Sequence, residues 1–459
     1  MPDRHLLDAF LEAERDATLA ALADWVRIPS VSAQPLHAAD VERAAQWCAE
    51  RMEHAGLEHV EILPTPGHPA VYGDWLHAGE EAITALVYGH HDVQPPEPLD
   101  EWHSPPFEPV VRDGQLFGRG AVDDKGQVLY QLEAIRGLLS DGGRLPVNVK
   151  FLVEGEEEIG SPNFEALLER ERERLACDVI VVSDTGMWAP DLPTVTTGMR
   201  GLVACDVTLR TARRDVHSGL FGGAVPNAAH WAARLIAALH DADGRVTIPG
   251  FYDGVRPLLP AERQSFAALP FDEAAWVGTS GVGRLEGEGG YSTLERIWAR
   301  PTCDVAGIHA GYSGDGVKTI VPAAARFKVT FRLVADQDPP AVAAAFEAWL
   351  REQVPDGIEL NVRLDGMVGP ALTDVSHPGM GALSRAIARV WGTEPLFTRT
   401  GGSGPEESLG RVLKAQVLYL GVSLPDDRIH APNERILLEQ LWKGLLAAGE
   451  LWRELGELR

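Results

Sequence analysis

Cysteine and long apolar runs are scarce in this sequence of 459 residues, and each scarcity excludes a class of protein. The four cysteines stand far apart and form no CxxC pair, so we expect neither a disulfide framework nor a thiolate metal site. No apolar run approaches the ~18 residues of a membrane span, and the N-terminus lacks the basic start and apolar stretch of a signal peptide. The sequence therefore predicts a cytoplasmic protein without a membrane partner.

Basic residues are in the minority as well. The chain has 41 lysines and arginines against 67 aspartates and glutamates, which gives a formal net charge of −26. A surface of this sign repels a phosphate backbone, so the composition argues against nucleic acid as a partner. Apolar residues make up 45% of the chain, as in ordinary globular proteins, and the length favours more than one domain.

The apolar pattern up to residue 197 predicts alternating strands and helices. Short apolar strands are expected at 83–88, 147–153 and 178–182, and apolar residues at helical spacing fill the segment between the first two. This alternation is typical of an α/β fold with a mainly parallel sheet and helices on both faces.

A second α/β pattern begins at Gly198. It includes a predicted strand in which Phe327, Val329 and Phe331 alternate with polar residues. The C-terminal segment that follows has too few strands for a core of its own, so we assign it to the first pattern. We therefore predict two domains: a discontinuous one, 1–197 and 367–459, and an inserted one, 198–366.

Residue types that bind metals follow each of the three early strands. His90 and Asp92 follow the first strand, "EGEEEIGS" (154–161) follows the second, and Asp184 follows the third. In open α/β sheets the carboxyl ends of the strands converge on the ligand site. Two further clusters are "GRGAVDDKG" (118–126) and "DDRIHAPNE" (426–434).

Each cluster has an ordinary structural explanation when it is taken alone. A single histidine is more often hydrogen bonded than bound to metal, a run of glutamates is usually a solvated turn, and an aspartate beside glycine is commonly a turn or a helix start. Independent explanations for all five clusters are much harder to accept together. The set of imidazole nitrogens and carboxylate oxygens suits zinc or manganese.

In this order, the motifs GHHDVQP, GRGAVDDKG, EGEEEIGS, VSD and RIHAPNE resemble those of the M20 family of metallopeptidases, above all its carnosinase-like cytosolic dipeptidase branch. The resemblance covers essentially the whole chain. It implies a zinc-peptidase-like catalytic domain with a mixed sheet, and an inserted α/β lid that also forms a homodimer. It further implies a pair of divalent cations in each subunit, Zn²⁺ or alternatively Mn²⁺, and a small peptide as the substrate.

The resemblance also assigns the metal ligands. His90 and Asp184 are expected to hold one cation, Glu158 and His430 the other, and Asp123 to bridge them. The peptide bond that follows Asp123 is expected to be cis.

Two acidic residues receive catalytic roles. Glu157 resembles the family's general base, which acts on a hydroxide between the metals, and the spacing E-G-x-E-E-x-G-S leaves Glu156 at a variable position. Asp92 lies on the same side of an extended chain as His90, so it is placed to accept the second imidazole N–H and fix the ring. A turn cap is the alternative for Asp92. His91 points the other way and is expected to be structural.

Three segments of the inserted domain and its flank supply the remaining candidates. "DVHSGLFGG" (215–223) resembles the lid motif whose histidine, here His217, polarises the substrate carbonyl in the partner subunit's site. By the same resemblance, Arg332 and Thr319 bind the C-terminal carboxylate of the peptide, and Ser403 in "TRTGGSGP" contacts the substrate. Without the resemblance, these are a histidine beside a turn, an outward arginine on a strand and a flexible loop.

The sequence therefore predicts metal-dependent hydrolysis of dipeptides that have a free C-terminal carboxylate. One departure concerns the substrate, because Gly366-Met367-Val368-Gly369 stands where carnosinase-like enzymes have His-Gly, so carnosine itself is not expected. An N-acyl-amino-acid deacylase or carboxypeptidase of the same superfamily is the first alternative. A metal-binding scaffold without turnover is the second, and the spare carboxylate of Glu157 argues against it.

Overall fold

The structure, a computed structural model, describes residues 3–140 and 143–458 and divides into two compact units. The first unit contains Met1–Thr197, Thr373–Thr398 and Gly404–Arg459, and the second contains Gly198–Leu372 and Arg399–Ser403. The chain crosses from one to the other in strands β8 (Thr194–Met199) and β16 (Leu396–Thr400).

The second unit ends later than the boundary at residue 366 that the sequence suggested. It extends to Leu372 because strand β15 (Ala371–Leu372) pairs with Met199 and Gly198. It also includes the segment Arg399–Ser403, in which Arg399 forms an ion pair with Glu262. Both differences come from pairing between distant segments, which local sequence patterns do not reveal.

A six-stranded sheet of order β1-β2-β6-β3-β7-β17 forms the centre of the first unit. Its strands are β1 (Glu58–Leu63), β2 (Ala70–Trp75), β3 (Thr84–His90), β6 (Asn148–Glu154), β7 (Val179–Val182) and β17 (Gln416–Tyr419). Strands β6, β3, β7 and β17 are mutually parallel, whereas β2 is antiparallel to both of its neighbours. The sheet is therefore mixed, and the predicted α/β class is confirmed.

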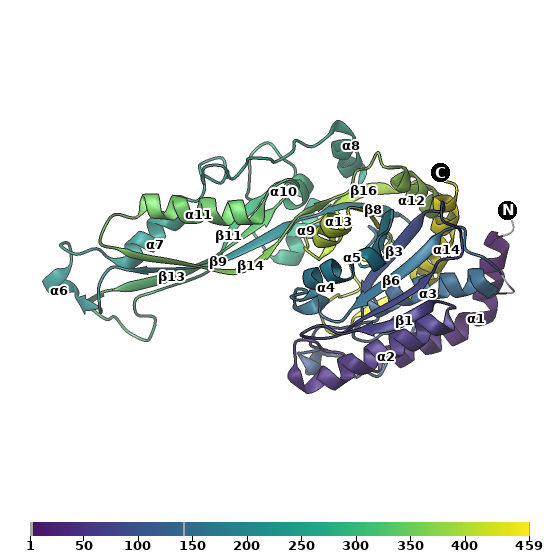
Figure 1. Ribbon diagram of the computed structural model, residues 1–459. Helices are drawn as coiled ribbons and strands as arrows, with labels where there is room; N and C mark the ends of the chain where they lie inside the picture. Colours follow the sequence, from purple (N-terminus) through teal and green to yellow (C-terminus); the bar gives the residue numbers. More distant parts are fainter. Residues whose placement is uncertain (1–2, 141–142, 459) are drawn as a thin grey trace. The chain divides into compact units, whose positions relative to one another are not determined.

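Helices cover both faces of this sheet (Figure 1). Their bounds are α1 (Asp3–Val26), α2 (Ala38–His54), α3 (Lys125–Leu139), α4 (Phe164–Arg170), α5 (Arg172–Leu175), α12 (Pro378–Trp391), α13 (Glu406–Leu413) and α14 (Leu438–Gly456). Side chains along β3 alternate between the faces, because Val87 belongs to the core that includes Leu129 of α3, while the ring of Tyr88 lies 5.4 Å from that of Phe164 in α4. A small sheet of β18 (Arg435–Leu437), β5 (Gln115–Phe117) and β4 (Val110–Arg112) completes the unit.

The second unit is built on a four-stranded antiparallel sheet of order β11-β13-β9-β14. Its strands are β9 (Gly201–Arg210), β11 (Thr302–Ala310), β13 (Ala324–Leu333) and β14 (Glu359–Val368), with a short pair β10 (Val216–His217) and β12 (Ile320–Val321). Its helices are α6 (Ser218–Phe221), α7 (Ala228–Ala237), α8 (Pro260–Ala268), α9 (Glu273–Ser280), α10 (Thr293–Ala299) and α11 (Pro339–Gln353).

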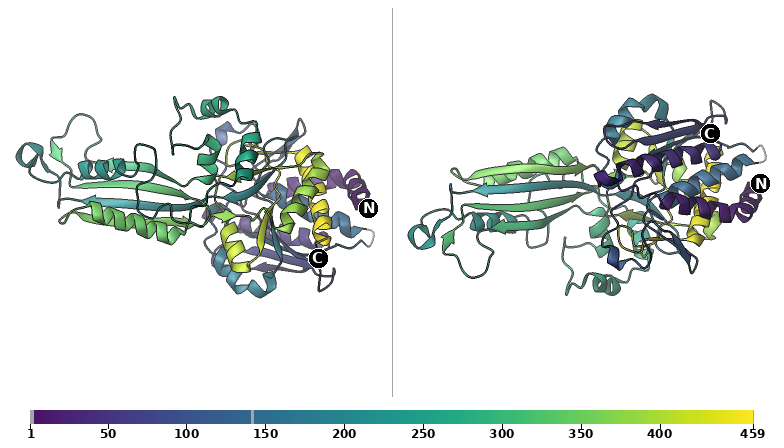
Figure 2. Two further views of the ribbon diagram at one scale, coloured as in Figure 1. Left: turned by 90° about the horizontal axis from the view of Figure 1, so that it is seen from above. Right: turned by 90° about the horizontal axis from the view of Figure 1, so that it is seen from below.

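Helices α7 and α11 cover one face of this sheet (Figures 1 and 2), and the other face carries polar side chains such as Arg326, Lys328 and Thr330 of β13. The predicted alternation on β13 is confirmed, because Phe327, Val329 and Phe331 are buried in a core shared with Phe346 of α11. The intervening residues of β13, among them Arg332, therefore lie on the polar face.

Within residues 3–140 and 143–458, every helix is too short or too polar to serve as a membrane-spanning segment.

Candidate metal centre

Three parallel strands of the first unit end at the same edge of the sheet, and polar side chains follow each of them. His90 is the last residue of β3, and Asp184 comes shortly after β7. Strand β6 leads into a short 3₁₀ turn, Glu157–Ile159, which carries two further carboxylates. Because these strands are buried along their length, the polar groups gather only where the chain leaves the sheet.

Asp123 lies between the imidazoles of two histidines. Its Oδ1 is 2.9 Å from Nε2 of His90, and its Oδ2 is 3.0 Å from Nε2 of His430. The peptide bond between Asp123 and Asp124 is cis, as the resemblance implied. A carboxylate that presents a different oxygen to each imidazole has the arrangement that a bridging metal ligand needs.

Each imidazole also has a carboxylate of its own. Oδ2 of Asp184 is 3.6 Å from Nε2 of His90, and Oε2 of Glu158 is 3.1 Å from Nε2 of His430. In the described part of the chain, the buried Oε2 of Glu158 has no partner with the alignment of a hydrogen bond. The five residues predicted as ligands thus form a continuous series of contacts: Asp184, His90, Asp123, His430, Glu158.

This donor set fits a pair of divalent cations. Ligand atoms that share a tetrahedral zinc lie about 3.3 Å apart, given zinc–ligand distances of ~2.0–2.1 Å. The side-chain contacts here, 2.9 to 3.6 Å, span that value. Ligand atoms of His90, Asp123 and Glu158 all lie within 4.8 Å of one another, and so do those of His90, Glu157 and Asp184. Imidazole and carboxylate donors suit Zn²⁺ or Mn²⁺.

The carboxylates of the centre destabilise one another's charged forms. Burial raises the pKa of Glu158 to about 7, with a further contribution from the charge of Asp123. Burial and Asp123 likewise raise the pKa of Asp184 to about 6. Contacts with Asp123 and Glu158 raise the pKa of His430 to about 10. A buried group of acids with this excess of negative charge is stabilised by bound cations.

Glu157 lies beside the ligands, and its neighbour Glu156 does not. Burial raises the pKa of Glu157 well above its ordinary value; the charge of His90 opposes this shift and that of Asp184 adds to it. Glu156 turns instead to Asn163, whose Nδ2 donates to its two carboxylate oxygens at 3.0 and 2.9 Å. Glu157 therefore lies next to the cluster, but among the described residues it forms no ion pair with either imidazole, unlike Asp123, Asp184 and Glu158.

Asp92 contacts more groups than the sequence suggested. Nδ1 of His90 is 3.1 Å from the backbone oxygen of Asp92 and 3.4 Å from its Oδ1. The Asp92 carboxylate also accepts the backbone N–H groups of Glu157 and Glu158, at 3.2 and 3.1 Å, and the hydroxyl of Ser32 at 2.6 Å. One carboxylate thus orients the imidazole and fixes the glutamate turn at the same time.

Glu434 is a residue of the site region that sequence reasoning missed. It is fully buried, and its Oε2 accepts a hydrogen bond from Nη1 of Arg119 at 2.6 Å. It also accepts the backbone N–H groups of Gly120, Val122 and Asp123 at 3.0 to 3.2 Å. Glu434 therefore holds the segment that carries Asp123 against the segment that carries His430. Its position in RIHAPNE was the only available signal.

His91 is structural, as expected from its orientation. It is fully buried, and its Nε2 lies 2.9 Å from the backbone oxygen of Pro69. Burial lowers the pKa of His91 to about 4, so this imidazole is neutral at physiological pH.

The residues predicted to bind substrate all belong to the second unit. At one end of its sheet, next to α6 (Figure 1), the exposed His217 ends β10, and the following N–H donates to the backbone oxygen of Thr319 at 3.0 Å. At the other end, Nη1 of Arg332 donates to Oγ of Ser403 at 2.9 Å. Strand β13 lies between the two pairs, and its eight residue steps from Ala324 to Arg332 alone span about 26 Å at ~3.3 Å per residue. An extended dipeptide of ~7 Å cannot touch both pairs of a single chain.

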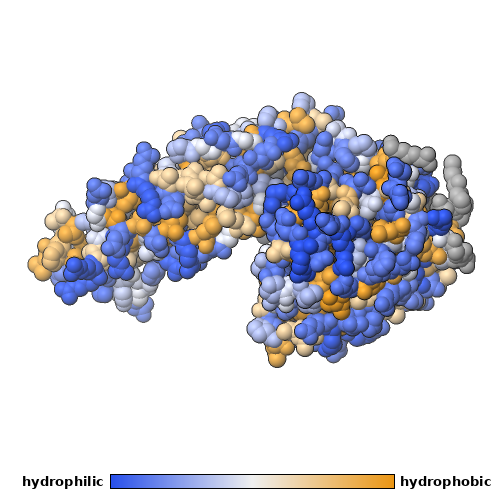
Figure 3. Space-filling view, in the orientation of Figure 1, coloured by the Kyte–Doolittle hydropathy of each residue, from blue (hydrophilic) through white to orange (hydrophobic). Residues whose placement is uncertain are grey.

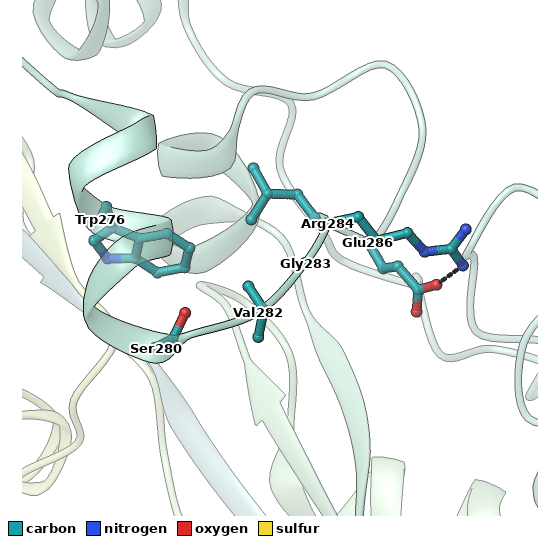
Figure 4. Close-up of a pocket in the computed structure, with 7 residues that line it drawn as sticks. Trp276, Ser280, Val282, Gly283, Arg284 and Glu286 are labelled. Atoms are coloured by element: carbon teal, nitrogen blue, oxygen red, sulfur yellow. Dashed lines mark hydrogen bonds and ion pairs between the residues drawn. The ribbon is translucent and has the colours of Figure 1, made fainter.

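A cavity of about 640 Å³ near the end of α9 is separate from all of these residues (Figure 4). It is open to solvent and lined mainly by Trp276, Val282 and Leu285, with an ion pair between Arg284 and Glu286 at its rim. It contains none of the predicted ligands or catalytic residues, so we do not assign the chemistry to it.

Comparison with known proteins agrees with this geometry. The model of peptidase family M20/M25/M40 matches residues 86–454. The human β-Ala-His dipeptidase is 29% identical over 447 residues, covering 93% of this chain and 88% of its own. The cysteinylglycine-S-conjugate dipeptidase of Corynebacterium striatum is 31% identical over 436 residues, covering 93% and 92%.

A solved structure is similar over almost its full length. The M20 family metallo-carboxypeptidase of Sulfolobus solfataricus matches with a TM-score of 0.84 and 31% identity, covering 96% of this chain and 99% of that one.

Proposed function

The chain belongs to peptidase family M20/M25/M40, and on that premise we propose that it is a metallodipeptidase acting on dipeptides with a free C-terminal carboxylate. The observation that carries the proposal is Asp123, which presents one oxygen to His90 and the other to His430. The names of the dipeptidases from human and Corynebacterium striatum support the substrate class, since each matches 93% of this chain.

We propose Zn²⁺ as the metal, with Mn²⁺ as the alternative. His90 and Asp184 would hold one ion, Glu158 and His430 the other, and Asp123 both. When bound, such a pair supplies Lewis acidity and lowers the pKa of water at neutral pH. Glu157, beside His90 and Asp184, is placed to serve as the general base, which takes a proton from the attacking water and returns it to the leaving amine. Asp92 keeps this glutamate and the His90 ring in position.

A homodimer in which His217 acts in the partner's site is part of the proposal. Nδ1 of His217 accepts the N–H of Gly219 at 3.0 Å, so a neutral ring carries its proton on the exposed Nε2 and can donate to a substrate carbonyl. The distance along β13 supports donation to a second chain. Apolar side chains around His217, such as Leu220 and Val317, are 78% and 93% exposed, and such residues gather at this end of the unit (Figure 3).

In such a dimer, Arg332 and Ser403 would bind the C-terminal carboxylate of the substrate. Thr319 would enter the site together with His217, from the other chain. Oγ of Ser403 donates to the backbone oxygen of Arg200 at 2.6 Å, so this hydroxyl chiefly orients Arg332. We also propose a cytoplasmic location, which the four free cysteines favour.

A substrate panel tests the proposal. The protein reconstituted with Zn²⁺ or Mn²⁺ should hydrolyse unmodified dipeptides with a kcat/KM at least tenfold above that for N-acetyl or N-succinyl amino acids. A preference for acylated amino acids would reject the dipeptidase in favour of a deacylase. Faster release of the last residue from tripeptides and longer peptides would favour the carboxypeptidase reading, which the Sulfolobus solfataricus relative's name suggests.

The shared site makes a separate prediction. His217→Ala and Glu157→Ala dimers should each be inactive, and mixing them with subunit exchange should restore about a quarter of wild-type activity, because half of the dimers are hybrids with one complete site. As the control, a His217→Ala/Glu157→Ala double variant mixed with Glu157→Ala should restore nothing. If proven exchange leaves the first mixture inactive, His217 acts within its own chain.

A further inference from the structure

Two guanidinium groups of the second unit lie together without an acidic partner. Arg332 donates to Ser403, and within the described ranges it forms no ion pair. The side chain of Arg200 has no hydrogen bond or ion pair with any described residue, although its Nε is buried. An unpartnered buried donor of this kind is costly unless a ligand satisfies it.

The glycine-rich loop holds the backbone of Arg200 close to Arg332. The N–H of Arg200 donates to the oxygen of Gly402 at 3.0 Å, and the oxygen of Arg200 accepts the hydroxyl of Ser403 at 2.6 Å. A Cβ at Gly401 would come within 3.0 Å of Nη2 of Arg200, so the loop packs directly on the guanidinium. Ser403 therefore contacts both arginines, one through its backbone and the other through its side chain.

The electrostatics of the pair point to a missing anion. Burial and, second, the positive charge of Arg332 together lower the pKa of Arg200 to about 10, although Asp304 opposes the shift. Arg326 and Arg300 of the same unit do have acidic partners, Asp206 and Glu288. Arg200 is partly buried beside a second guanidinium and has no such partner, which a carboxylate ligand would supply.

We propose that Arg200 and Arg332 form a two-guanidinium site for a C-terminal residue with two carboxylates, so that the enzyme prefers dipeptides ending in glutamate or aspartate. The proposal rests on the proposed dipeptidase function. A guanidinium fork matches one carboxylate, so Arg332 serves the α-carboxylate and Arg200 serves the side-chain carboxylate. A substrate with a neutral C-terminal side chain leaves one of the two positive charges without a partner.

The first test compares two dipeptides of the same shape, Ala-Glu and Ala-Gln. Wild-type protein should show at least a tenfold higher kcat/KM for Ala-Glu, mostly through KM. Arg200→Met should reduce this ratio to below about threefold, and Arg200→Lys should retain part of it. Arg210→Met is the matched control and should leave the ratio unchanged, because Arg210 lies at the far end of β9, the strand that begins directly after Arg200. Because the result is a ratio, a variant that folds poorly does not distort it.

Three outcomes would overturn the proposal. The first is a wild-type enzyme without preference for Ala-Glu, and the second is a preference that survives in Arg200→Met. The third is an equal loss on both dipeptides in Arg200→Met, which would assign Arg200 to the α-carboxylate instead.

A binding measurement separates this proposal from the dipeptidase function. In isothermal titration calorimetry, wild-type protein should bind L-glutamate at least tenfold more tightly than L-glutamine, and Arg200→Met should bind the two alike. If no dipeptide is hydrolysed but this binding difference is present, the proposed function fails and the two-carboxylate site stands. If hydrolysis is present and the two amino acids bind equally, the proposed function stands and the two-carboxylate site fails.

Discussion

Replacing Glu157 by alanine is expected to abolish dipeptide hydrolysis while the metal content stays close to that of the wild type. The carboxylate lies beside the ligand cluster, but the contacts to the two imidazoles come from Asp123, Asp184 and Glu158. Loss of a general base typically lowers the rate by ~10²–10⁴-fold, and we expect the upper end because the acidic groups nearest to Glu157 are the predicted metal ligands. The measurements are kcat and metal per chain by mass spectrometry.

The neighbours of Glu157 supply its controls. Glu156→Ala should keep most of the activity, since Glu156 is bound to Asn163. Glu158→Ala should lose metal as well as activity, because its Oε2 approaches His430. Two results would show that the assignment of the general base is wrong by one position. In the first, Glu157→Ala loses metal as well as activity. In the second, Glu156→Ala loses activity but keeps its metal.

Asp123→Ala is expected to remove both cations and, with them, all measurable activity. Asp123 is the carboxylate that approaches both histidines, so neither ion keeps a full set of ligands without it. Asp184→Ala, by contrast, removes a carboxylate that approaches His90 only, and should weaken one cation far more than the other. Metal per chain after dialysis, together with kcat, distinguishes the two variants.

Asp178→Ala is the matched control for this experiment. Asp178 directly precedes β7, so it lies at the opposite end of this strand from Asp184. Its Oδ2 accepts the N–H of Thr84 at 2.7 Å. It should change neither metal content nor kcat by more than a few-fold. An Asp123→Ala protein that retains both ions would contradict the bridging role and the dinuclear centre built on it.

The sequence predicted the elements of the first unit well because their signals are local. Strands expected at 83–88, 147–153 and 178–182 appear as Thr84–His90, Asn148–Glu154 and Val179–Val182. Buried parallel strands are short apolar runs, which a sequence shows directly. The ligand candidates were recognisable for a related reason: each follows such a run or lies in a motif of fixed spacing.

Tertiary structure decided what joins these segments. Local patterns do not state that β6 lies between β2 and β3, or that Glu434 accepts the N–H of Gly120, 314 residues away in the chain. They also placed Asp92 beside His90 without revealing its bonds to the backbone of Glu157 and Glu158. Hydrogen bonds of this kind depend on which surfaces pack together.

By itself, the sequence determined the α/β class, the family resemblance and the residues that could bind metal, because periodicity and motif spacing are properties of short segments. Only the folded chain decided that Asp123 meets two imidazoles, and that His217 pairs with β12 before β13 begins whereas Arg332 lies near the end of β13. It also left Arg200 beside Arg332 without an ion pair to any described residue. These are distances between residues far apart in sequence, and packing of the whole chain sets them.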